Sequence, residues 1–181
     1  MVIQKRKKKT SFKKATPWIL TGVAFVCIVI RLAHQGPVPA GRSLEPFPDE
    51  AVVVRVIDGD TVILGTNQHV RYLGIDTPEI RKKIRGVWEY APEPYGEAAK
   101  AANVALVEGR RVQLEYDRER LDKYGRILAY VRLEDGTLVN GELVRAGLAR
   151  VLIIPPNDRY SGLFYQFERE AREEKKGIWA K

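Results

Sequence analysis

The alternation of apolar and polar residues predicts a small β-rich domain that begins near residue 51. Short β-branched runs bounded by turn residues are typical of strands, and five of them occupy residues 51–57, 61–64, 68–75, 111–116 and 126–133. Helical patterns that end at or near a glycine occupy residues 95–107, 140–146 and 163–176. Five short strands with helices between them favour a small closed barrel.

Residues 81–94 fit neither a strand nor a helix pattern. This stretch is basic, aromatic and proline-containing, so we expect a mobile loop. The whole pattern predicts a mainly β, α+β domain: a five-stranded barrel of the oligonucleotide-binding (OB) type with three packed helices.

A separate apolar segment precedes the domain. Residues 15–30 carry no charge, and a cluster of lysines and arginines lies before them. This asymmetry predicts a basic cytoplasmic tail over 1–14, a transmembrane signal anchor over 15–33, a Pro/Gly-rich linker over 34–50 and an extracytoplasmic domain over 51–181. One alternative is a signal peptide cleaved near Val38-Pro39-Ala40, which would release the domain. Another is a buried core helix, but the lysine-rich flank argues against it.

The net charge of +8 reflects the N-terminal tail. Residues 1–34 contain eight of the 31 Lys and Arg residues and no acid, so the remaining 23 balance all 23 Asp and Glu residues. Any basic groove in the domain must therefore come from local arrangement. The single cysteine excludes an intrachain disulfide, and two histidines argue against a His-rich metal cluster.

Candidate chemistry gathers in three short motifs at residues 58–61 (DGDT), 71–79 (RYLGIDTPE) and 122–126 (DKYGR). Taken singly, they read as a turn, a helix cap and a solvated hairpin. Taken together, they supply what phosphodiester hydrolysis requires: oxygen ligands for a hard cation, cations that neutralise transition-state charge, and a group that orients or deprotonates water.

Each requirement has candidate residues. The carboxylates of Asp60 and Asp76, with the Thr77 carbonyl, are suitable metal ligands. Arg71 and Arg126 are suited to phosphate, because the guanidinium fork can bind two oxygens at once. The remaining candidate is Glu79, as a general base. Arg71 and Asp76 are five residues apart, so on a regular strand they would point to opposite faces; their convergence requires a bend, a bulge or the long reach of the arginine.

The ordered motifs resemble the thermonuclease, or staphylococcal-nuclease-like, family. The matching text is VIDGDTV (56–62), VRYLGIDTPE (70–79), DKYGRILAYV (122–131) and LVNGELVRAGLARV (138–151), followed by KKGIWAK at the C-terminus. The resemblance covers about residues 51–181.

This resemblance implies an OB-type barrel and a nuclease that cleaves DNA and RNA with Ca²⁺. Cleavage would occur at the 5′ side of the phosphate and leave 3′-phosphate products. The implied site residues are Asp60, Asp76 and Thr77 for calcium, Asp58 in its outer shell, Arg71 and Arg126 for phosphate, Glu79 as the base or as a water-positioning group, and Lys123 and Tyr124 for a terminal phosphate.

One region departs from the family pattern. The family prototype has two tyrosines that pack around the bound nucleotide, and the sequence aligns Ile153 and Pro155 with them. Because aromatic stacking contributes about 1–3 kcal/mol per base, we expect weaker binding or altered base preference. Tyr160, Trp88 or Tyr90 are candidates to compensate. The basic residues Arg81, Lys82, Lys83 and Arg85 are candidates for flanking phosphates, with a solvated loop as the equal alternative.

Two rival hypotheses remain. The chain could be a non-catalytic binding module of the same fold, but Arg71, Glu79 and Arg126 are all present. A generic single-strand-binding barrel would require a basic, aromatic groove and gives no reason for the paired aspartates. No feature implies a protein partner, and we expect a monomer that acts on DNA and RNA and contacts a membrane through its N-terminal segment.

Overall fold

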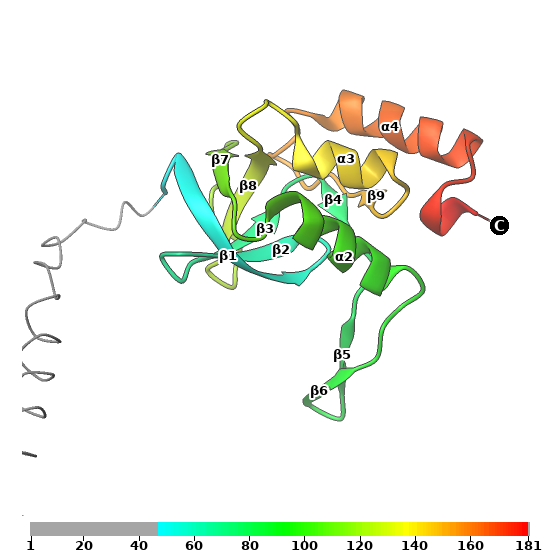
Figure 1. Cartoon of the computed structure of the whole chain (residues 1–181), viewed down its shortest axis with the longest axis horizontal. Helices are drawn as coiled ribbons and strands as arrows, with labels where there is room; N and C mark the ends of the chain where they lie inside the picture. Colours follow the sequence, from blue (N-terminus) through cyan, green and yellow to red (C-terminus); the bar gives the residue numbers. More distant parts are fainter. Residues whose placement is uncertain (1–46, 181) are drawn as a thin grey trace, which may run out of the picture. The chain divides into compact units, whose positions relative to one another are not determined.

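A closed five-stranded barrel forms the centre of the computed structural model, which describes residues 47–180. Its strands follow the order β1-β2-β3-β8-β7 (Figure 1). Their bounds are β1 (Glu50–Asp58), β2 (Thr61–Leu64), β3 (His69–Tyr72), β7 (Arg111–Glu115) and β8 (Ile127–Arg132). All neighbours pair antiparallel except β3 and β8, which are parallel. The predicted OB-type barrel is confirmed.

Three α-helices of the described region pack on this barrel. They are α2 (Gly96–Val107), α3 (Val139–Arg145) and α4 (Ser161–Glu173), and a short 3₁₀ helix, η1 (Gly177–Trp179), follows. Helix α2 packs against β1, while α3 contacts both β8 and α4. The predicted helices therefore exist, with ends displaced by at most three residues from the sequence-based bounds.

The barrel interior is filled by aliphatic side chains that alternate along the strands, such as Val53, Val70 and Val131, all fully buried. Burial of this apolar surface is the main favourable term for folding. Two tyrosines, Tyr72 and Tyr130, are buried among them. Each hydroxyl has a partner, because the Tyr72 hydroxyl donates to Asn103 at 2.9 Å and that of Tyr130 donates to Asp117 at 3.1 Å.

The expected strand over 68–75 is divided in two. Strand β3 ends at Tyr72, and a separate short strand, β4 (Ile75–Asp76), pairs with β9 (Arg150–Val151). Gly74 lies between them with a φ of 78°, and a Cβ there would lie 2.6 Å from the Phe164 ring. Only glycine combines this backbone conformation with such close packing. The chain therefore bends sharply just before Asp76.

Residues 81–90 form a β-hairpin, so the expectation of a loop over 81–94 is wrong for this part. Strands β5 (Arg81–Ile84) and β6 (Val87–Tyr90) pair antiparallel. The two residues that join them, Arg85 and Gly86, have φ values of 49° and 88°. Two positive φ values are the signature of a type I′ turn, which suits the twist of a two-residue hairpin. Figure 1 shows the hairpin leaving the barrel beside α2.

The described chain is packed onto the barrel from its first residue. The Phe47 ring contacts Tyr116 edge-on at 5.8 Å between centroids, and the Tyr116 hydroxyl donates to the Pro48 carbonyl at 2.5 Å. The tail, membrane segment and most of the linker predicted over 1–46 lie outside the described residues. Within 47–180, no helix is long and apolar enough to cross a bilayer.

The buried amide of Asn140 generates a stability prediction. Its Nδ2 donates to the Leu73 carbonyl and its Oδ1 accepts from the Val131 amide, both at 2.9 Å. Replacement by alanine leaves two buried backbone groups unpaired, so we expect Asn140→Ala to lower the free energy of unfolding by about 2–4 kcal/mol. Urea denaturation measures this quantity.

The matched control is Glu142→Ala on the same helix, where a surface ion pair with Arg145 at 2.8 Å is lost. Such exposed pairs contribute little, so the free energy of unfolding should change by less than about 1 kcal/mol. A loss below about 1 kcal/mol for Asn140→Ala would show that the amide does not hold α3 to the barrel.

Candidate active site

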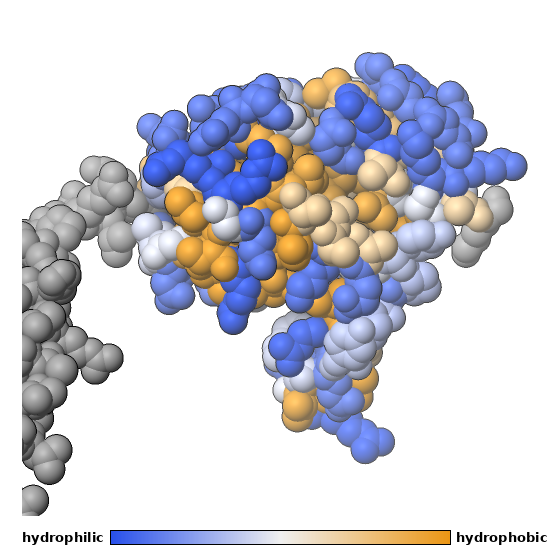
Figure 2. Space-filling view, in the orientation of Figure 1, coloured by the Kyte–Doolittle hydropathy of each residue, from blue (hydrophilic) through white to orange (hydrophobic). Residues whose placement is uncertain are grey.

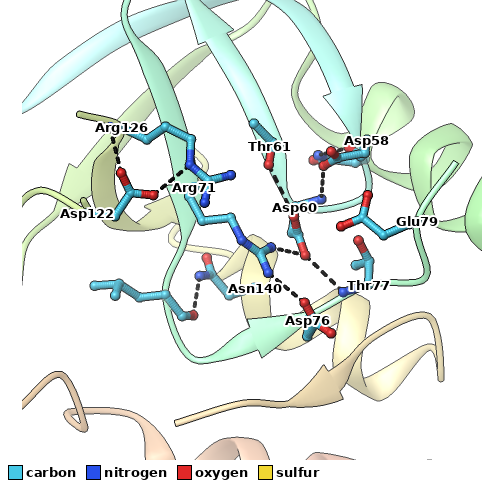
Figure 3. Close-up of polar contacts among 12 residues, drawn as sticks. Asp58, Asp60, Thr61, Arg71, Asp76, Thr77, Glu79, Asp122, Arg126 and Asn140 are labelled. Atoms are coloured by element: carbon cyan, nitrogen blue, oxygen red, sulfur yellow. Dashed lines mark hydrogen bonds and ion pairs between the residues drawn. The ribbon is translucent and has the colours of Figure 1, made fainter. Parts of the chain in front are cut away.

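The guanidinium of Arg71 lies between two carboxylates (Figure 3). Its Nη2 donates to Asp76 at 2.7 Å, and its Nη1 forms an ion pair with Asp60. Arg71 and Asp76 therefore converge, as the bend at Gly74 allows.

The β1–β2 turn fixes Asp60, which is only 4% exposed. Its Oδ1 accepts from the Thr61 hydroxyl at 3.2 Å, and its Oδ2 accepts from the Thr77 amide at 2.9 Å. Gly59 permits this approach, because a Cβ there would lie 2.6 Å from the Thr77 side chain. The turn and the segment after β4 are thus locked together through one carboxylate.

The two other acids of the site, Asp58 and Glu79, have raised pKa values. Burial is the main cause of the raised pKa of Asp58, and it outweighs the Thr61 hydrogen bond and the positive charges of Arg71 and Arg126. Burial also raises the pKa of Glu79, with the negative charge of Asp58 as the next cause. Figure 3 shows both side chains beside Asp60. Burial therefore favours the protonated forms of the two carboxyl groups on this side of Arg71.

Arg126 lies in a neighbouring part of the same site, where Asp122 orients it. The Asp122 carboxylate accepts from Nε of Arg126 at 2.7 Å and from its backbone amide at 2.9 Å. The sequence suggested only a solvated hairpin for the motif that contains Asp122 and missed this orienting role. The spacing carried this signal. Asp122 lies four residues before Arg126, and the turn at Gly125 between them can bring the carboxylate to the arginine.

A pocket of about 410 Å³ joins the two arginines to the residues expected to hold a terminal phosphate. Lys123 and Tyr124 line it together with Arg71 and Arg126. The Tyr124 ring is 72% exposed, and the Arg126 guanidinium carbon lies 5.7 Å from its centroid. The structure thus brings the phosphate-binding candidates to one hollow.

The two residues aligned with the expected tyrosines, Ile153 and Pro155, do not line the pocket. Leu152 and Ile154 line the pocket, whereas Ile153 packs against the core, with its Cδ1 3.6 Å from the Cβ position of Gly74. Pro155 is exposed and is absent from the pocket lining. Ile153 and Pro155 therefore do not line this pocket, whereas Leu152 and Ile154 do, since side chains of an extended chain alternate between core and pocket.

Tyr160 does not compensate for those tyrosines. Its hydroxyl donates to Glu115 at 2.8 Å and accepts from Arg132 at 2.7 Å, and its ring packs edge-on against Tyr130 at 4.7 Å. It joins α4 to the barrel and is absent from the pocket lining. The other two candidates, Trp88 and Tyr90, lie on the exposed hairpin.

Two contacts made by α2 hold the acidic side of the site. The fully buried Asn103 donates to the Asp58 carbonyl at 3.2 Å and accepts from Tyr72. Gly96 lies so close to Glu79 that a Cβ there would be 2.8 Å from the Glu79 carbonyl oxygen. The sequence predicted no role for either residue, because both contacts are made over long sequence separations.

The donor set fits a hard divalent cation. Asp60 and Asp76 both contact the Arg71 guanidinium, and the Thr77 backbone amide donates to Asp60. Residues 47–180 contain no cluster of three His, Cys, Asp or Glu side chains suited to a metal. A cation held by two carboxylates and one carbonyl would complete its shell with water or substrate oxygens, as Ca²⁺ readily does.

Comparison with known proteins agrees with this geometry. The family model of the staphylococcal nuclease homologues matches residues 69–181. The chain belongs to this family. Family membership makes it a hydrolytic nuclease that acts on nucleic acid, as its sequence motifs predicted.

Three relatives illustrate the similarity. The thermonuclease of Staphylococcus intermedius is 40% identical over 171 residues, which cover 92% of this chain and 98% of that protein. The thermonuclease of Staphylococcus hyicus is 34% identical, covering 93% and 99% respectively. The SPbeta prophage-derived endonuclease YokF of Bacillus subtilis is 46% identical over 132 residues, which cover 70% of this chain but only 43% of that protein.

The close contact at Gly96 generates a prediction about catalysis. An added methyl group must displace the Glu79 backbone or the start of α2, and small displacements of a reacting group are costly. We expect Gly96→Ala to lower kcat for nucleic-acid hydrolysis about tenfold or more, with KM changed less than about twofold. Steady-state kinetics on a fluorescent oligonucleotide measure both parameters.

Gly162→Ala on α4 is the control, because a Cβ at Gly162 would contact nothing within 4 Å. Its kcat should match that of the wild type. Wild-type kcat in Gly96→Ala would contradict the assigned role of this contact.

Proposed function

We propose that the chain is a Ca²⁺-dependent endonuclease that hydrolyses DNA and RNA at the 5′ side of the phosphate and leaves 3′-phosphate products. The observation that carries the proposal is the convergence of Asp60 and Asp76 on one buried guanidinium, with Glu79 beside them. The negatively charged phosphates of a nucleic acid can lie close to the paired carboxylates only if cations lie between them.

Asp60, Asp76 and the Thr77 carbonyl would hold the calcium ion, with Asp58 behind them. When bound, the ion would polarise the phosphate and neutralise developing negative charge. In this proposal Asp58 is not a direct ligand of the calcium ion. Its Oδ1 accepts from the Asp60 amide at 3.2 Å, which stabilises the turn that presents Asp60.

Arg71 and Arg126 bind the phosphate in this proposal. Both line the same pocket, and each has a carboxylate partner that orients it, Asp76 and Asp122 respectively. Two planar guanidinium groups can donate to several phosphate oxygens and stabilise the extra charge of the transition state. Lys123 and Tyr124, in the same pocket, would contact the terminal phosphate of the bound nucleotide.

Glu79 acts on the attacking water, either as its base or by positioning it. Its side chain lies on the opposite side of Asp60 from Arg126 in Figure 3. Water oriented there would face a phosphate held by the two arginines. In an in-line attack the water oxygen would bond to phosphorus while the bond from phosphorus to the 5′ oxygen on the opposite side breaks. The water gives up its proton, and the leaving 5′ oxygen takes one and departs as a 5′-hydroxyl.

Digestion assays test the proposal. The full chain should degrade single-stranded DNA and RNA in Ca²⁺ and stop when EGTA removes the ion, because the carboxylate pair then lacks its cation. End-group analysis should find 3′-phosphates. Glu79→Gln and Arg126→Ala should each lower kcat by about 100-fold or more, with unchanged circular dichroism.

Glu134→Gln, at an exposed site outside the pocket, is the matched control and should retain full turnover. Undiminished cleavage in EGTA would refute the metal assignment. Binding of oligonucleotides without cleavage in any divalent ion would favour the non-catalytic binding module instead.

We also infer that the nuclease domain is extracytoplasmic, either tethered or released. The support is the lysine-rich stretch before the uncharged residues 15–30. An alkaline phosphatase fusion after residue 181 should be active in a bacterial host, and extraction with alkaline carbonate should leave a tethered form in the membrane fraction. An inactive fusion would refute export, and mass spectrometry of the recovered chain would distinguish the anchor from the cleaved signal peptide.

A further inference from the structure

The β5–β6 hairpin has two different faces, which its strand register defines. Arg81 pairs with Tyr90 and Lys83 with Trp88. Side chains of directly opposed residues share a face of an antiparallel pair, as do residues two apart along a strand. Two cations and two aromatic rings therefore lie on one face, which we call the aromatic–basic face; it consists of Arg81, Lys83, Trp88 and Tyr90.

The opposite face has a different chemistry. It carries the pair Lys82 and Glu89 and the pair Ile84 and Val87. Lys82 is occupied by an ion pair with Glu93 at 3.1 Å. Because this ion pair neutralises Lys82, the other positive charges of the hairpin lie on the aromatic–basic face and at Arg85 in the turn.

The aromatic rings are open to solvent. Trp88 is 60% exposed and Tyr90 is 68% exposed, although most large aromatic side chains are at least partly buried. A hydrogen bond with Glu97, in the first turn of α2, raises the pKa of Tyr90 and ties the end of β6 to that helix. Figure 2 shows the hairpin standing clear of the barrel, with polar and apolar side chains on its surface.

The hairpin begins directly after the site. Arg81 follows Glu79 by two residues, and two backbone bonds close the base: Ala91 to the Ile80 carbonyl at 3.2 Å and Glu93 to the Glu79 carbonyl at 2.8 Å. The Glu79 amide also donates to the Glu93 carboxylate at 3.2 Å. The base of the hairpin therefore lies directly beside Glu79.

We propose that the aromatic–basic face binds single-stranded nucleic acid beside the cleavage position, with Trp88 and Tyr90 stacking on bases and Arg81 and Lys83 contacting phosphates. This inference rests on the proposed function and extends it by naming the form of substrate. Aromatic rings can stack only on bases that are not already stacked in a duplex, and basic side chains between them follow the backbone. In this proposal the aromatic–basic face binds bases by stacking, whereas Leu152 and Ile154 in the pocket provide only apolar contacts.

Fluorescence anisotropy of the full chain in detergent tests the inference, with a labelled 20-nucleotide single strand in EDTA. We expect the double variant Trp88→Ala/Tyr90→Ala to raise Kd about tenfold or more, because each stacked base is worth about that factor. Trp88→Phe keeps a ring and should stay within about threefold of wild type. A Kd for the double variant within twofold of wild type would overturn the proposal.

The opposite face provides the matched control. Ile84→Ser/Val87→Ser removes two exposed apolar side chains from the same hairpin and should change Kd by less than about twofold. An equal loss in this control would overturn the face assignment. Circular dichroism checks that each variant keeps its fold.

The salt dependence of binding tests Arg81 and Lys83 apart from the aromatic rings. Arg81→Gln/Lys83→Gln should reduce the slope of log K against log salt by about 1.4, since each phosphate contact on a single strand contributes about 0.7. The aromatic variant should leave the slope unchanged. An unchanged slope in the charge variant would show that these residues do not contact phosphate.

Other occupants of the face give different results. Loss of binding to phosphatidylserine vesicles in the aromatic variant, with oligonucleotide Kd unchanged, would overturn the proposal in favour of a lipid surface. Conversion of a dimer to a monomer, seen by sedimentation, would do so in favour of a second copy of the chain. Cleavage of the probe in EDTA, seen on a gel, would refute the metal assignment of the proposed function without bearing on the hairpin.

Discussion

The contact of the Arg71 guanidinium with the buried Asp60 and the half-exposed Asp76 is the interaction on which the rest of the site depends. A charge removed from water is costly unless it is paired, and removing one partner of a buried pair typically costs about 3–5 kcal/mol. The three residues come from β3, from the turn after β1 and from β4. The fold must therefore bring three strand ends to one point, and its irregular features serve that requirement.

Buried amides and glycines meet the requirement. Asn140 ties α3 to the connection between β3 and β4, and Asn103 ties α2 to the end of β1. Close contacts at Gly59 and Gly96 set the positions of Thr77 and Glu79. The side chains proposed for catalysis thus lie on a scaffold of helices bonded to strand ends, which favours preorganised electrostatic stabilisation of the transition state.

Most of the fold could be predicted because it depends on local patterns. Apolar alternation and glycine stops located all five barrel strands and all three helices of the described region, with small errors at their ends. Two features were missed. The type I′ turn at Arg85-Gly86 was hidden by a basic, proline-rich context, and the break at Gly74 was hidden by an apolar run that continues through Leu73 and Ile75.

The sequence by itself determined the chemistry: the acids, the two arginines and their order along the chain were sufficient to predict a nuclease of this family. Only the tertiary structure decided which side chains meet. It placed Leu152 and Ile154 in the pocket where Ile153 and Pro155 were expected, and it gave Asp122 and Gly96 their roles. The physical reason is that residue type fixes what a group can do, whereas its neighbours depend on register and on contacts between segments far apart in the chain.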